Sequence, residues 1–200
     1  MTTKPFIIGI GHVQRVGKDV AASALQRELG FTRFGFADQL KELSMAADPM
    51  VTATTRNVNV QIGHGKLSWV VGGMGWEGAK DGYPEVRKFL QNLGAGARAT
   101  FGEDFWVDQL FAKIARLNTN RIVIPDVRYR NEVEAIKNAG GYVIRVNRPG
   151  AKAFGHESET ELMNFTGWDE EFDNDREIDY LEKNVVSYVK NLLDVKPVKK

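Results

Sequence analysis

The sequence predicts an α/β fold: a doubly wound parallel sheet with helices on both faces. First, short apolar runs rich in isoleucine and valine recur along the chain, as buried strands do. Second, segments with apolar residues at helical spacing lie between these runs. Third, glycines stand at several of the junctions between the two kinds of segment. Strands that alternate with helices are typical of a parallel sheet, and such sheets bind ligands beyond the carboxyl ends of their strands.

The first part of the chain alternates regularly between strand and helix. The run at 5–10 contains three isoleucines and ends at Gly11, which indicates a buried strand. Helical spacing of apolar residues up to a stop at Gly30 predicts a helix next. We expect, in order, a strand, a helix, a short strand and a helix, at residues 5–10, 19–29, 34–36 and 38–46.

Residues 47–83 break this rhythm. Residues 50–62 alternate loosely between apolar and polar side chains, which predicts a hairpin with its turn near 56–57. Seven glycines between positions 63 and 82 predict that the remainder is mobile or turn-rich. We interpret this stretch as an insertion outside the central sheet, an arm that could cover a substrate.

The second half of the chain returns to strands and helices. Strands are expected at 121–125 and 142–146, and helices at 84–93, 103–117, 131–139 and 177–193. The segment 148–170 is polar and irregular, which fits a mobile lid. We therefore expect one domain, 1–200, with an insertion at about 47–83 and a lid at about 148–170.

Composition excludes several classes of function. The chain has 200 residues and no cysteine, which excludes disulfide scaffolds, thiolate nucleophiles and cysteine-ligated zinc sites. The formal net charge of +1 gives no support for a dedicated binder of nucleic acid polymers or membrane surfaces. No apolar run approaches the ~20 residues of a membrane span, and the first residues lack the apolar core of a signal peptide. We expect a cytoplasmic protein.

The first strand-to-helix turn carries the clearest chemical signal. It reads GHVQRVGKD over residues 11–19, close to the phosphate-loop pattern GxxxxGK[ST]. In that pattern, backbone N–H groups and a helix N-terminus point at phosphate oxygens. Two positions depart from it: His12 occupies the first glycine position because Gly11 comes one residue early, and Asp19 replaces the hydroxyl residue. A carboxylate can still hold Mg²⁺, directly or through water. The alternative interpretation is an ordinary turn with a chance Gly-Lys pair.

Several strings, in the same order along the chain, resemble the bacteriophage deoxynucleoside monophosphate kinases. Residues 15–19 (RVGKD) resemble the family's RSGKD loop, 36–41 (FADQLK) its FADPLK segment, and 85–94 (EVRKFLQNLG) its VRRLLQxLG helix. Shorter counterparts are FWV at 105–107, PDVR at 125–128, RPG at 148–150 and ND at 174–175. The resemblance covers about residues 6–193.

This resemblance implies a P-loop kinase fold and a phosphotransfer activity. Its members transfer the γ-phosphoryl group of ATP to a 5′-deoxynucleoside monophosphate, with Mg²⁺, to give dNDP and ADP. The resemblance therefore implies ATP and a dNMP as partners. Relatives suggest a homodimer, and a phage-encoded enzyme would work in the host cytoplasm.

On the ATP side, the resemblance assigns the phosphate loop and one residue near the last helix. Lys18 would bridge the β- and γ-phosphates, Asp19 would orient Mg²⁺, and Asn174 lies where relatives hold the ATP base. Asn174 could also be a turn or cap residue. The residues expected to bind ATP are Arg15, Gly17, Lys18, Asp19, Val20 and Asn174; many relatives have threonine where Val20 stands.

On the acceptor side, Arg87, Gln91 and Gly94 are spaced so that they share one face of a helix. Arg87 can fork onto the 5′-phosphate, Gln91 can pair with the amide edge of a base, and Gly94 allows close approach of the backbone. Trp106 fits both a core position and a ring lying against the substrate. The residues expected to bind the dNMP are Lys41, Arg87, Gln91, Gly94, Trp106, Asp126 and Arg128.

The expected catalytic residues are Lys18, Asp126, Arg128 and Arg148. Asp126 ends a buried strand and could hold Mg²⁺ through water or accept a hydrogen bond from the 3′-hydroxyl. Arg128 would clamp the acceptor phosphate or the transferring group, and Arg148 would stabilise that group from the lid.

Two other interpretations stay open at this point. One is a different small-molecule P-loop kinase, similar to dephospho-coenzyme A kinase, from which the Arg87 helix and the FADQLK string differ. The other is a nucleotide-binding switch without turnover, which the His12 and Asp19 departures would fit. The residues do not fix the preferred base, or deoxyribose over ribose.

Overall fold

The computed structural model describes residues 4–11, 13, 15–54, 61–117, 119–151 and 160–195. The chain forms two compact units: unit 1 is Met1–Phe36 with Val107–Lys200, and unit 2 is Ala37–Trp106. Three expected features lie outside the described residues: the hairpin turn near 56–57, the loop position His12 and the middle of the lid, 152–159.

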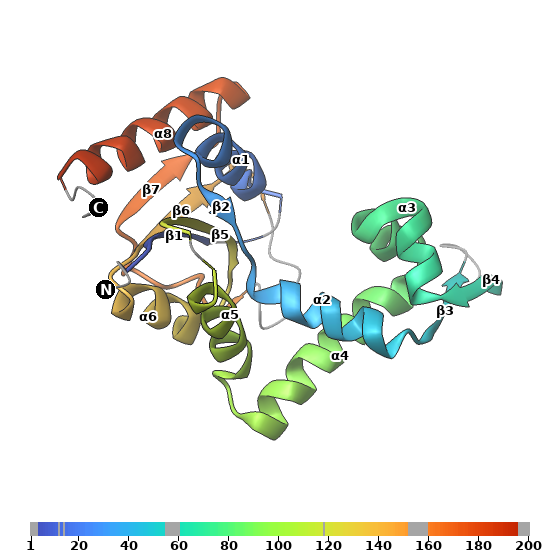
Figure 1. Cartoon of the computed structure of the whole chain (residues 1–200). Coiled ribbons are helices and arrows are strands. Elements are labelled where there is room, and N and C mark those ends of the chain that lie inside the picture. Colours follow the sequence, from blue (N-terminus) through green and yellow to red (C-terminus); the bar gives the residue numbers. More distant parts are fainter. Residues whose placement is uncertain are drawn as a thin grey trace. The chain divides into compact units, whose positions relative to one another are not determined.

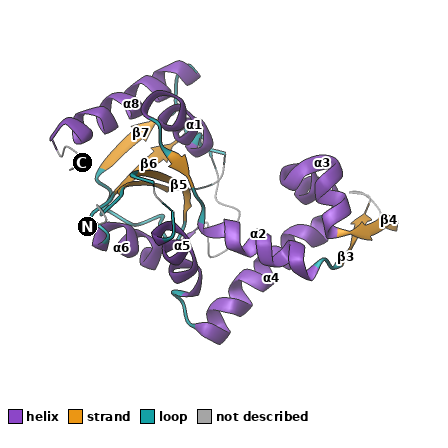
Figure 2. Ribbon diagram, viewed as in Figure 1, coloured by secondary structure: helices purple, strands orange, loops and turns teal. Residues whose placement is uncertain are grey.

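Unit 1 is built on a five-stranded parallel sheet (Figure 2). Its strands are β1 (Phe6–Gly11), β2 (Thr32–Arg33), β5 (Arg121–Val127), β6 (Tyr142–Asn147) and β7 (Glu170–Asp173). The spatial order is β2-β5-β1-β6-β7, and every pairing is parallel. Because β1 is central, the loop that follows it begins in the middle of the sheet's carboxyl edge.

Helices cover both faces of this sheet (Figure 1). On one face lie α1 (Lys18–Leu29) and α8 (Ile178–Val195), and on the other α5 (Phe105–Ala115) and α6 (Arg130–Asn138). Ile8 and Ile10 of β1 belong to the apolar cluster with α1 and α8, whereas Ile7 belongs to the cluster with α5 and α6. A strand covered on both sides is apolar at every position, as the sequence of β1 is. The predicted α/β fold, a doubly wound parallel sheet with helices on both faces, is confirmed.

Unit 2 has its own small core. After α2 (Phe36–Ala47), which starts at the end of unit 1, come β3 (Met50–Thr54) and β4 (Gln61–Lys66), which pair in antiparallel fashion and confirm the expected hairpin. Two helices follow, α3 (Leu67–Gly82) and α4 (Pro84–Phe101). The buried apolar residues that these elements share are Val51, Leu67, Val70, Ala79, Val86 and Leu90.

The expectation of a mobile or turn-rich stretch after the hairpin was wrong. Residues 67–82 form α3 despite their glycines, and only Gly75 has non-helical angles, with φ 69° and ψ 174°. Leu67 is fully buried and Val70 is 4% exposed. Burial of this apolar stripe outweighs the ~1 kcal/mol by which each glycine disfavours a helix.

Three further boundaries differ from the expectations. The helix expected to end at 93 continues to Phe101, because Ala97 is buried and extends the packed face. The short second strand lies at Thr32–Arg33 rather than at 34–36. β7 was missed because its sequence, EEFD, is charged and its residues are mostly exposed at the edge of the sheet.

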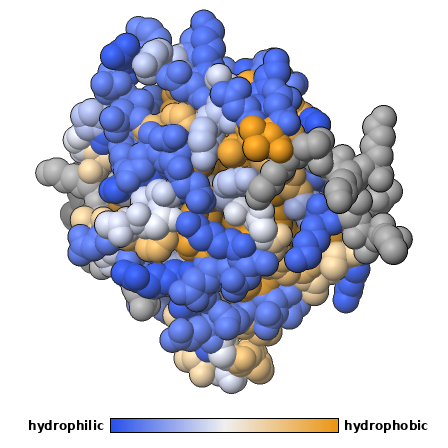
Figure 3. Space-filling view, turned by 90° about the vertical axis from the view of Figure 1, so that its left-hand side faces the viewer, coloured by the Kyte–Doolittle hydropathy of each residue, from blue (hydrophilic) through white to orange (hydrophobic). Residues whose placement is uncertain are grey.

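Unit 2 is larger than the expected insertion, because it also includes most of α2 and all of α4. The organisation as one domain stays a prediction. The face drawn in Figure 3 is mostly hydrophilic, with apolar side chains in small areas. In the described part of the chain, no helix is long and apolar enough to cross a bilayer.

Candidate active site

The turn between β1 and α1 has the backbone geometry of an anion-binding loop. Arg15 has φ 61° and Gly17 has φ 109°, both in the left-handed region, and Gly17 caps α1. The first hydrogen bond of the helix runs from the N–H of Ala21 to the carbonyl of Gly17. The N–H groups of the preceding residues in the first turn therefore have no partner within the helix and point out of its N-terminus.

Lys18 folds over this loop. Its side chain is largely buried, at 8% exposure, and its Nζ donates a hydrogen bond to the carbonyl of Val13 at 2.6 Å. A buried ammonium at a helix N-terminus adds a full positive charge to the partial charge of the helix dipole. The loop is thus an electropositive site suited to phosphate.

Asn174 lies behind the loop. Its Nδ2 donates to the carbonyl of Val16 at 2.8 Å, and its own N–H donates to the carbonyl of Asn147 at 2.7 Å. A Cβ added at Gly17 would come within 2.7 Å of the Asn174 Nδ2 and 3.0 Å of Leu181. Asn174 therefore fastens the phosphate loop to the end of β7, a contact that the sequence did not reveal.

Asp19, the residue in place of the usual hydroxyl, is paired with Arg33. The Arg33 guanidinium lies 2.5 Å from the Asp19 carboxylate, and both side chains are exposed. A carboxylate in the first turn beside Lys18 fits Mg²⁺, which prefers one or two carboxylates together with substrate phosphates. Among the described residues no group of three or more acidic or histidine side chains could form an all-protein metal cage. Sequence reasoning missed Arg33 because it comes from β2.

Asp126 and Arg128 lie at the carboxyl end of β5, next to the loop. Gly11, where the loop starts, is paired with Val127, which stands between the two. The Asp126 Oδ1 accepts a hydrogen bond from the N–H of Phe36 at 3.0 Å, so this carboxylate also caps the start of α2. The structure thus brings Lys18, Asp126 and Arg128 to one edge of the sheet.

A buried acid that sequence reasoning missed adjoins this pair. Glu132 is 5% exposed, and its Oε2 accepts hydrogen bonds from the N–H groups of Arg128 at 2.6 Å and Tyr129 at 3.0 Å. Burial, and then the charge of Asp126, raise the pKa of Glu132 to about 8, against the opposing effect of those N–H donors and of the Arg128 charge. A glutamate in the first turn of a predicted helix was the available signal.

The expected lid is only partly described. Arg148 follows β6 directly and is exposed. Beyond the undescribed residues, Leu162 is 4% exposed and packs in the core with Phe165 and Trp168 beside it. The part of the expected lid from Leu162 onward is therefore packed in the core of unit 1, and fewer residues are left that could form a lid.

Trp168 also explains why a glycine, Gly11, stands one residue before the first glycine position of the phosphate-loop pattern. A Cβ at Gly11 would overlap the ring of Trp168, whose Cζ3 would be only 2.7 Å away. Gly11 is thus required by packing rather than by phosphate.

Two of the expected acceptor-side cations lie in one neighbourhood of unit 2. Lys80 makes an ion pair with Glu77 at 2.7 Å, and the pKa of Glu77 is lowered by Lys80 first and also by the charges of Arg87 and Lys41. Arg87 further pairs with Asp81 at 3.7 Å. Glu77 is thus paired with Lys80, and the charges of Arg87 and Lys41 also lower its pKa, whereas Lys41 itself pairs with Asp38 at 3.8 Å. Lys80 was not predicted.

Gly94 and Trp106 are also brought together. The Trp106 Nε1 donates to the carbonyl of Gly94 at 3.1 Å, and Trp106 is 8% exposed. Trp106 is therefore a core residue that ties the start of α5 to α4. Gln91 is exposed on α4.

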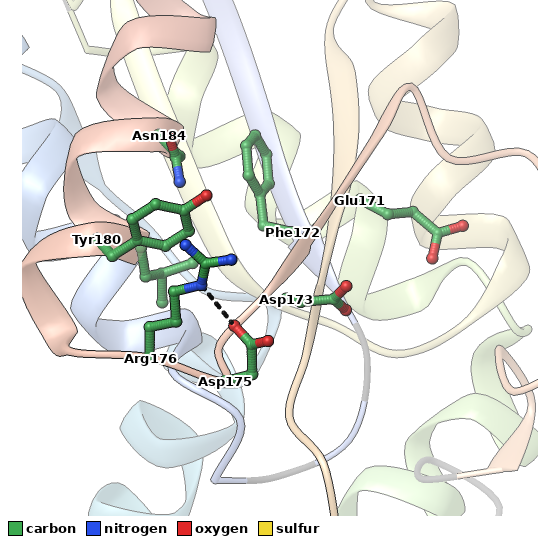
Figure 4. Close-up of a pocket in the computed structure, with 8 residues that line it drawn as sticks. Glu171, Phe172, Asp173, Asp175, Arg176, Tyr180 and Asn184 are labelled. Atoms are coloured by element: carbon green, nitrogen blue, oxygen red, sulfur yellow. Dashed lines mark ion pairs between the residues drawn. The ribbon is translucent and has the colours of Figure 1, made fainter.

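A pocket of about 230 Å³ lies between β7 and α8. Figure 4 shows Phe172, Asp173 and Glu171 on the strand side and Tyr180 and Asn184 on the helix side. The Arg176 guanidinium stands over the Tyr180 ring, 4.5 Å from its centroid, and lies 3.8 Å from Asp175. Leu181 lines this pocket and also approaches Gly17, so the pocket adjoins the phosphate loop.

The expected residues thus divide by unit. The ATP-side residues and the catalytic set lie in unit 1, and the remaining acceptor-side residues lie in unit 2. The acceptor-side residues of unit 2 are Lys41, Arg87, Gln91, Gly94 and Trp106.

The sequence is similar to those of known proteins. The model of the deoxynucleotide monophosphate kinase family matches residues 78–185, more than half of the chain. A protein of Acanthamoeba polyphaga mimivirus that bears the name of a deoxynucleotide monophosphate kinase is 30% identical over 200 residues, covering 92% of this chain and 96% of its own.

Solved structures with a similar arrangement are more distant. Shikimate kinase from Aquifex aeolicus has a TM-score of 0.46 and 9% identity, over 94% of this chain and 98% of its own. Dephospho-CoA kinase from Campylobacter jejuni has a TM-score of 0.41 and 16% identity, over 94% of this chain and 96% of its own.

The family match and the mimivirus relative decide the classification; the structural likenesses do not bear on it. The matched stretch includes Arg87, Gln91 and the segment 125–128, which carried part of the resemblance in the sequence. That resemblance is confirmed. The chain belongs to the deoxynucleotide monophosphate kinase family.

Proposed function

We propose that this chain transfers the γ-phosphoryl group of ATP to a 5′-deoxynucleoside monophosphate, giving dNDP and ADP. The observation that carries the proposal is the loop between β1 and α1, in which a buried Lys18 lies over left-handed turns in a chain of this family. Phosphoryl transfer needs little covalent help from the protein; it needs two phosphates in line and cations around a spreading negative charge.

On the donor side, the N–H groups of Lys18, Asp19 and Val20 would surround the β-phosphate of ATP, with Gly17 giving the turn. Lys18 would leave the Val13 carbonyl and bridge the β- and γ-phosphates. Arg15 would contact the same phosphates.

The base of ATP would enter the pocket between β7 and α8. This pocket adjoins the loop through Leu181, and its carboxylates can accept hydrogen bonds from an exocyclic amino group. A base there and a triphosphate on the loop would be parts of one bound nucleotide.

Mg²⁺ would be held by the Asp19 carboxylate, and when bound it would neutralise charge on the β- and γ-phosphates. Arg33 would keep that carboxylate beside the loop through their ion pair.

On the acceptor side, Arg87 and Lys41, with Lys80 near them, would exchange their present carboxylate partners for the 5′-phosphate; those partners are Asp81 for Arg87 and Asp38 for Lys41. Gln91 would pair with the amide edge of the base, and Trp106 would hold the Gly94 backbone against the ligand.

During transfer, Arg128 and Arg148 would stabilise the oxygens of the γ-phosphoryl group, and Asp126 would accept a hydrogen bond from the 3′-hydroxyl or hold Mg²⁺ through water. We further expect a cytoplasmic enzyme, which would work in the host cytoplasm if a bacteriophage encodes it. It would act on free nucleotides as a homodimer, and it would contact neither nucleic acid polymers nor membranes.

The test is ADP release in a coupled assay with ATP, Mg²⁺ and each of the four common dNMPs, with dephospho-coenzyme A as a comparison substrate. Turnover with at least one dNMP, and at least tenfold less with dephospho-coenzyme A, is the expected result. Turnover with dephospho-coenzyme A alone would identify a different small-molecule kinase. ATP binding without any turnover would identify a switch.

A further inference from the structure

The orientation of one peptide group decides whether the loop offers a donor or an acceptor to a phosphate. The peptide between Val16 and Gly17 is planar and trans, so its carbonyl and its N–H point in opposite directions. The Val16 carbonyl points at the Asn174 carboxamide behind the loop. The Gly17 N–H is therefore aimed away from Asn174, towards the other side of the loop.

The glycine at position 17 makes the opposite orientation of this peptide sterically accessible. Gly17 stands at φ 109° and, having no Cβ, can adopt positive and negative φ about equally well. A flip of this peptide needs large and opposite rotations of ψ at Val16 and φ at Gly17, and glycine can adopt the φ that results. The flipped state would point the Val16 carbonyl at the phosphate, where two acceptors would repel each other.

The contact from Asn174 favours one of the two orientations. Val16 is fully buried, so its carbonyl needs a donor inside the protein, and Asn174 supplies it at 2.8 Å. Asn174 is itself fixed, because its N–H donates to the Asn147 carbonyl at the end of β6. The Asn174 side chain that holds the Val16 carbonyl is thus attached to the central sheet.

We propose that Asn174 is a positioning residue that holds the Val16–Gly17 peptide with its N–H towards the phosphates. This role differs from the contact with the ATP base that the sequence suggested. It rests on the proposed function only in that the loop takes a polyphosphate; it does not depend on which acceptor is phosphorylated.

The two roles give different results with a ligand that has no base. Inorganic tripolyphosphate can occupy the loop but not the base pocket. A residue that shapes the loop affects ATP and tripolyphosphate equally, whereas a residue that touches the base affects ATP alone. The binding of both ligands would be measured by titration calorimetry at one fixed Mg²⁺ concentration.

We expect Asn174→Ala to weaken the binding of ATP and of tripolyphosphate by the same factor, about tenfold, which corresponds to the loss of one well-placed hydrogen bond. Asn174→Leu, which keeps the volume but cannot donate, should do the same. Asn184→Ala is the matched control, because it removes another carboxamide, one that lines the neighbouring pocket on α8; it should leave the affinity for tripolyphosphate within twofold.

A loss of ATP affinity with tripolyphosphate unchanged in Asn174→Ala would make Asn174 a base contact and overturn the proposal. Unchanged affinity for both ligands would overturn it as well. The amide signal of Gly17 in a ¹⁵N spectrum is a second readout, and it should move in Asn174→Leu and stay in Asn184→Ala. If no dNMP is phosphorylated but tripolyphosphate binding depends on Asn174, the proposed function fails and this inference stands.

Discussion

At the scale of single residues, Lys18 is the side chain on which phosphotransfer depends most. Its Nζ is 2.6 Å from the Val13 carbonyl, so the ammonium is already inside the loop before a ligand arrives. Lys18→Met should lower kcat by 100-fold or more, because a transition-state charge contact is lost while the apolar stem is kept. The rate is measured by coupled ADP release, and the fold by circular dichroism. Lys190→Met, at an exposed position of α8, should leave the rate within twofold. A Lys18→Met enzyme with nearly full activity would contradict the assignment.

Glu132 predicts a pH dependence of stability with a definite sign. Below pH 4.5 the carboxyl is protonated in both the folded and the unfolded state. Between pH 4.5 and about 8 the unfolded state loses this proton while the folded state keeps it, so the free energy of unfolding falls as pH rises. Glu132→Gln cannot ionise. The free energy of unfolding of Glu132→Gln, relative to that of the wild type, should therefore increase by a few kcal/mol from pH 5 to pH 8, at ~1.4 kcal/mol per pH unit.

Urea denaturation at the two pH values measures this double difference. Glu134→Gln, on the exposed side of the same helix, is the matched control and should give the same difference at both. An equal effect of Glu132→Gln at pH 5 and pH 8 would show that the buried carboxyl keeps its ordinary pKa.

The residues of the loop could be predicted because their pattern is local, whereas their partners could not. GxxxxGK[ST] spans a few positions, and its departures at His12 and Asp19 were visible in the letters. Arg33 lies on another strand, and Asn174 meets Val16 across 158 positions, so only the folded sheet brings them together. Gly11 shows the same limit, since the ring that requires it is that of Trp168.

At the scale of elements, α4 offers a test with an internal control. Gly94 lies inside the helix, and an added Cβ would meet only the flexible end of Leu40, at 3.3 Å. Gly94→Ala should therefore keep or raise the free energy of unfolding by up to ~1 kcal/mol, as a helical alanine does. If the dNMP approaches the backbone here, the same change should raise its KM at least tenfold.

Gly96→Ala is the matched control, because it is two residues further on in the same helix and, among the described residues, no atom lies within 4 Å of a Cβ added there. It should stabilise the protein similarly and leave KM within twofold. An unchanged KM in Gly94→Ala would remove this glycine from the acceptor site.

The elements themselves were predictable where burial gives a pattern. β1 and the middle of β5 (residues 122–125) are continuous apolar runs because helices cover both of their faces, and this pattern led to the correct fold class. α3 and β7 were missed for opposite reasons. In α3, tertiary packing overrides the low helix propensity of its glycines, and in β7 an exposed edge strand has no apolar signature.

At the scale of the whole molecule, the expected half-sites follow the two units. The phosphate loop, the pocket between β7 and α8 and the end of β5 belong to unit 1, which has its own sheet and two apolar clusters. Arg87 and the cations near it belong to unit 2, which has a third cluster. The sequence could not predict this division, because the boundary at Phe36 falls within the first turn of α2 rather than in a loop.

This division predicts that a single substitution can weaken the enzyme's affinity for one nucleotide without changing its affinity for the other. Arg87→Ala should weaken the binding of a dNMP by tenfold or more, through loss of a bidentate contact with the phosphate, and leave ATP within twofold. Lys18→Met should have the reverse effect. Titration calorimetry with each nucleotide alone measures both affinities without turnover.

Lys88→Ala is the control, because it removes the neighbouring exposed cation on α4 and so tests the general loss of positive charge. It should change neither affinity by more than twofold. Equal losses of both ligands in Arg87→Ala would mean that the two units bind the nucleotides jointly and that the assignment of half-sites to units is wrong.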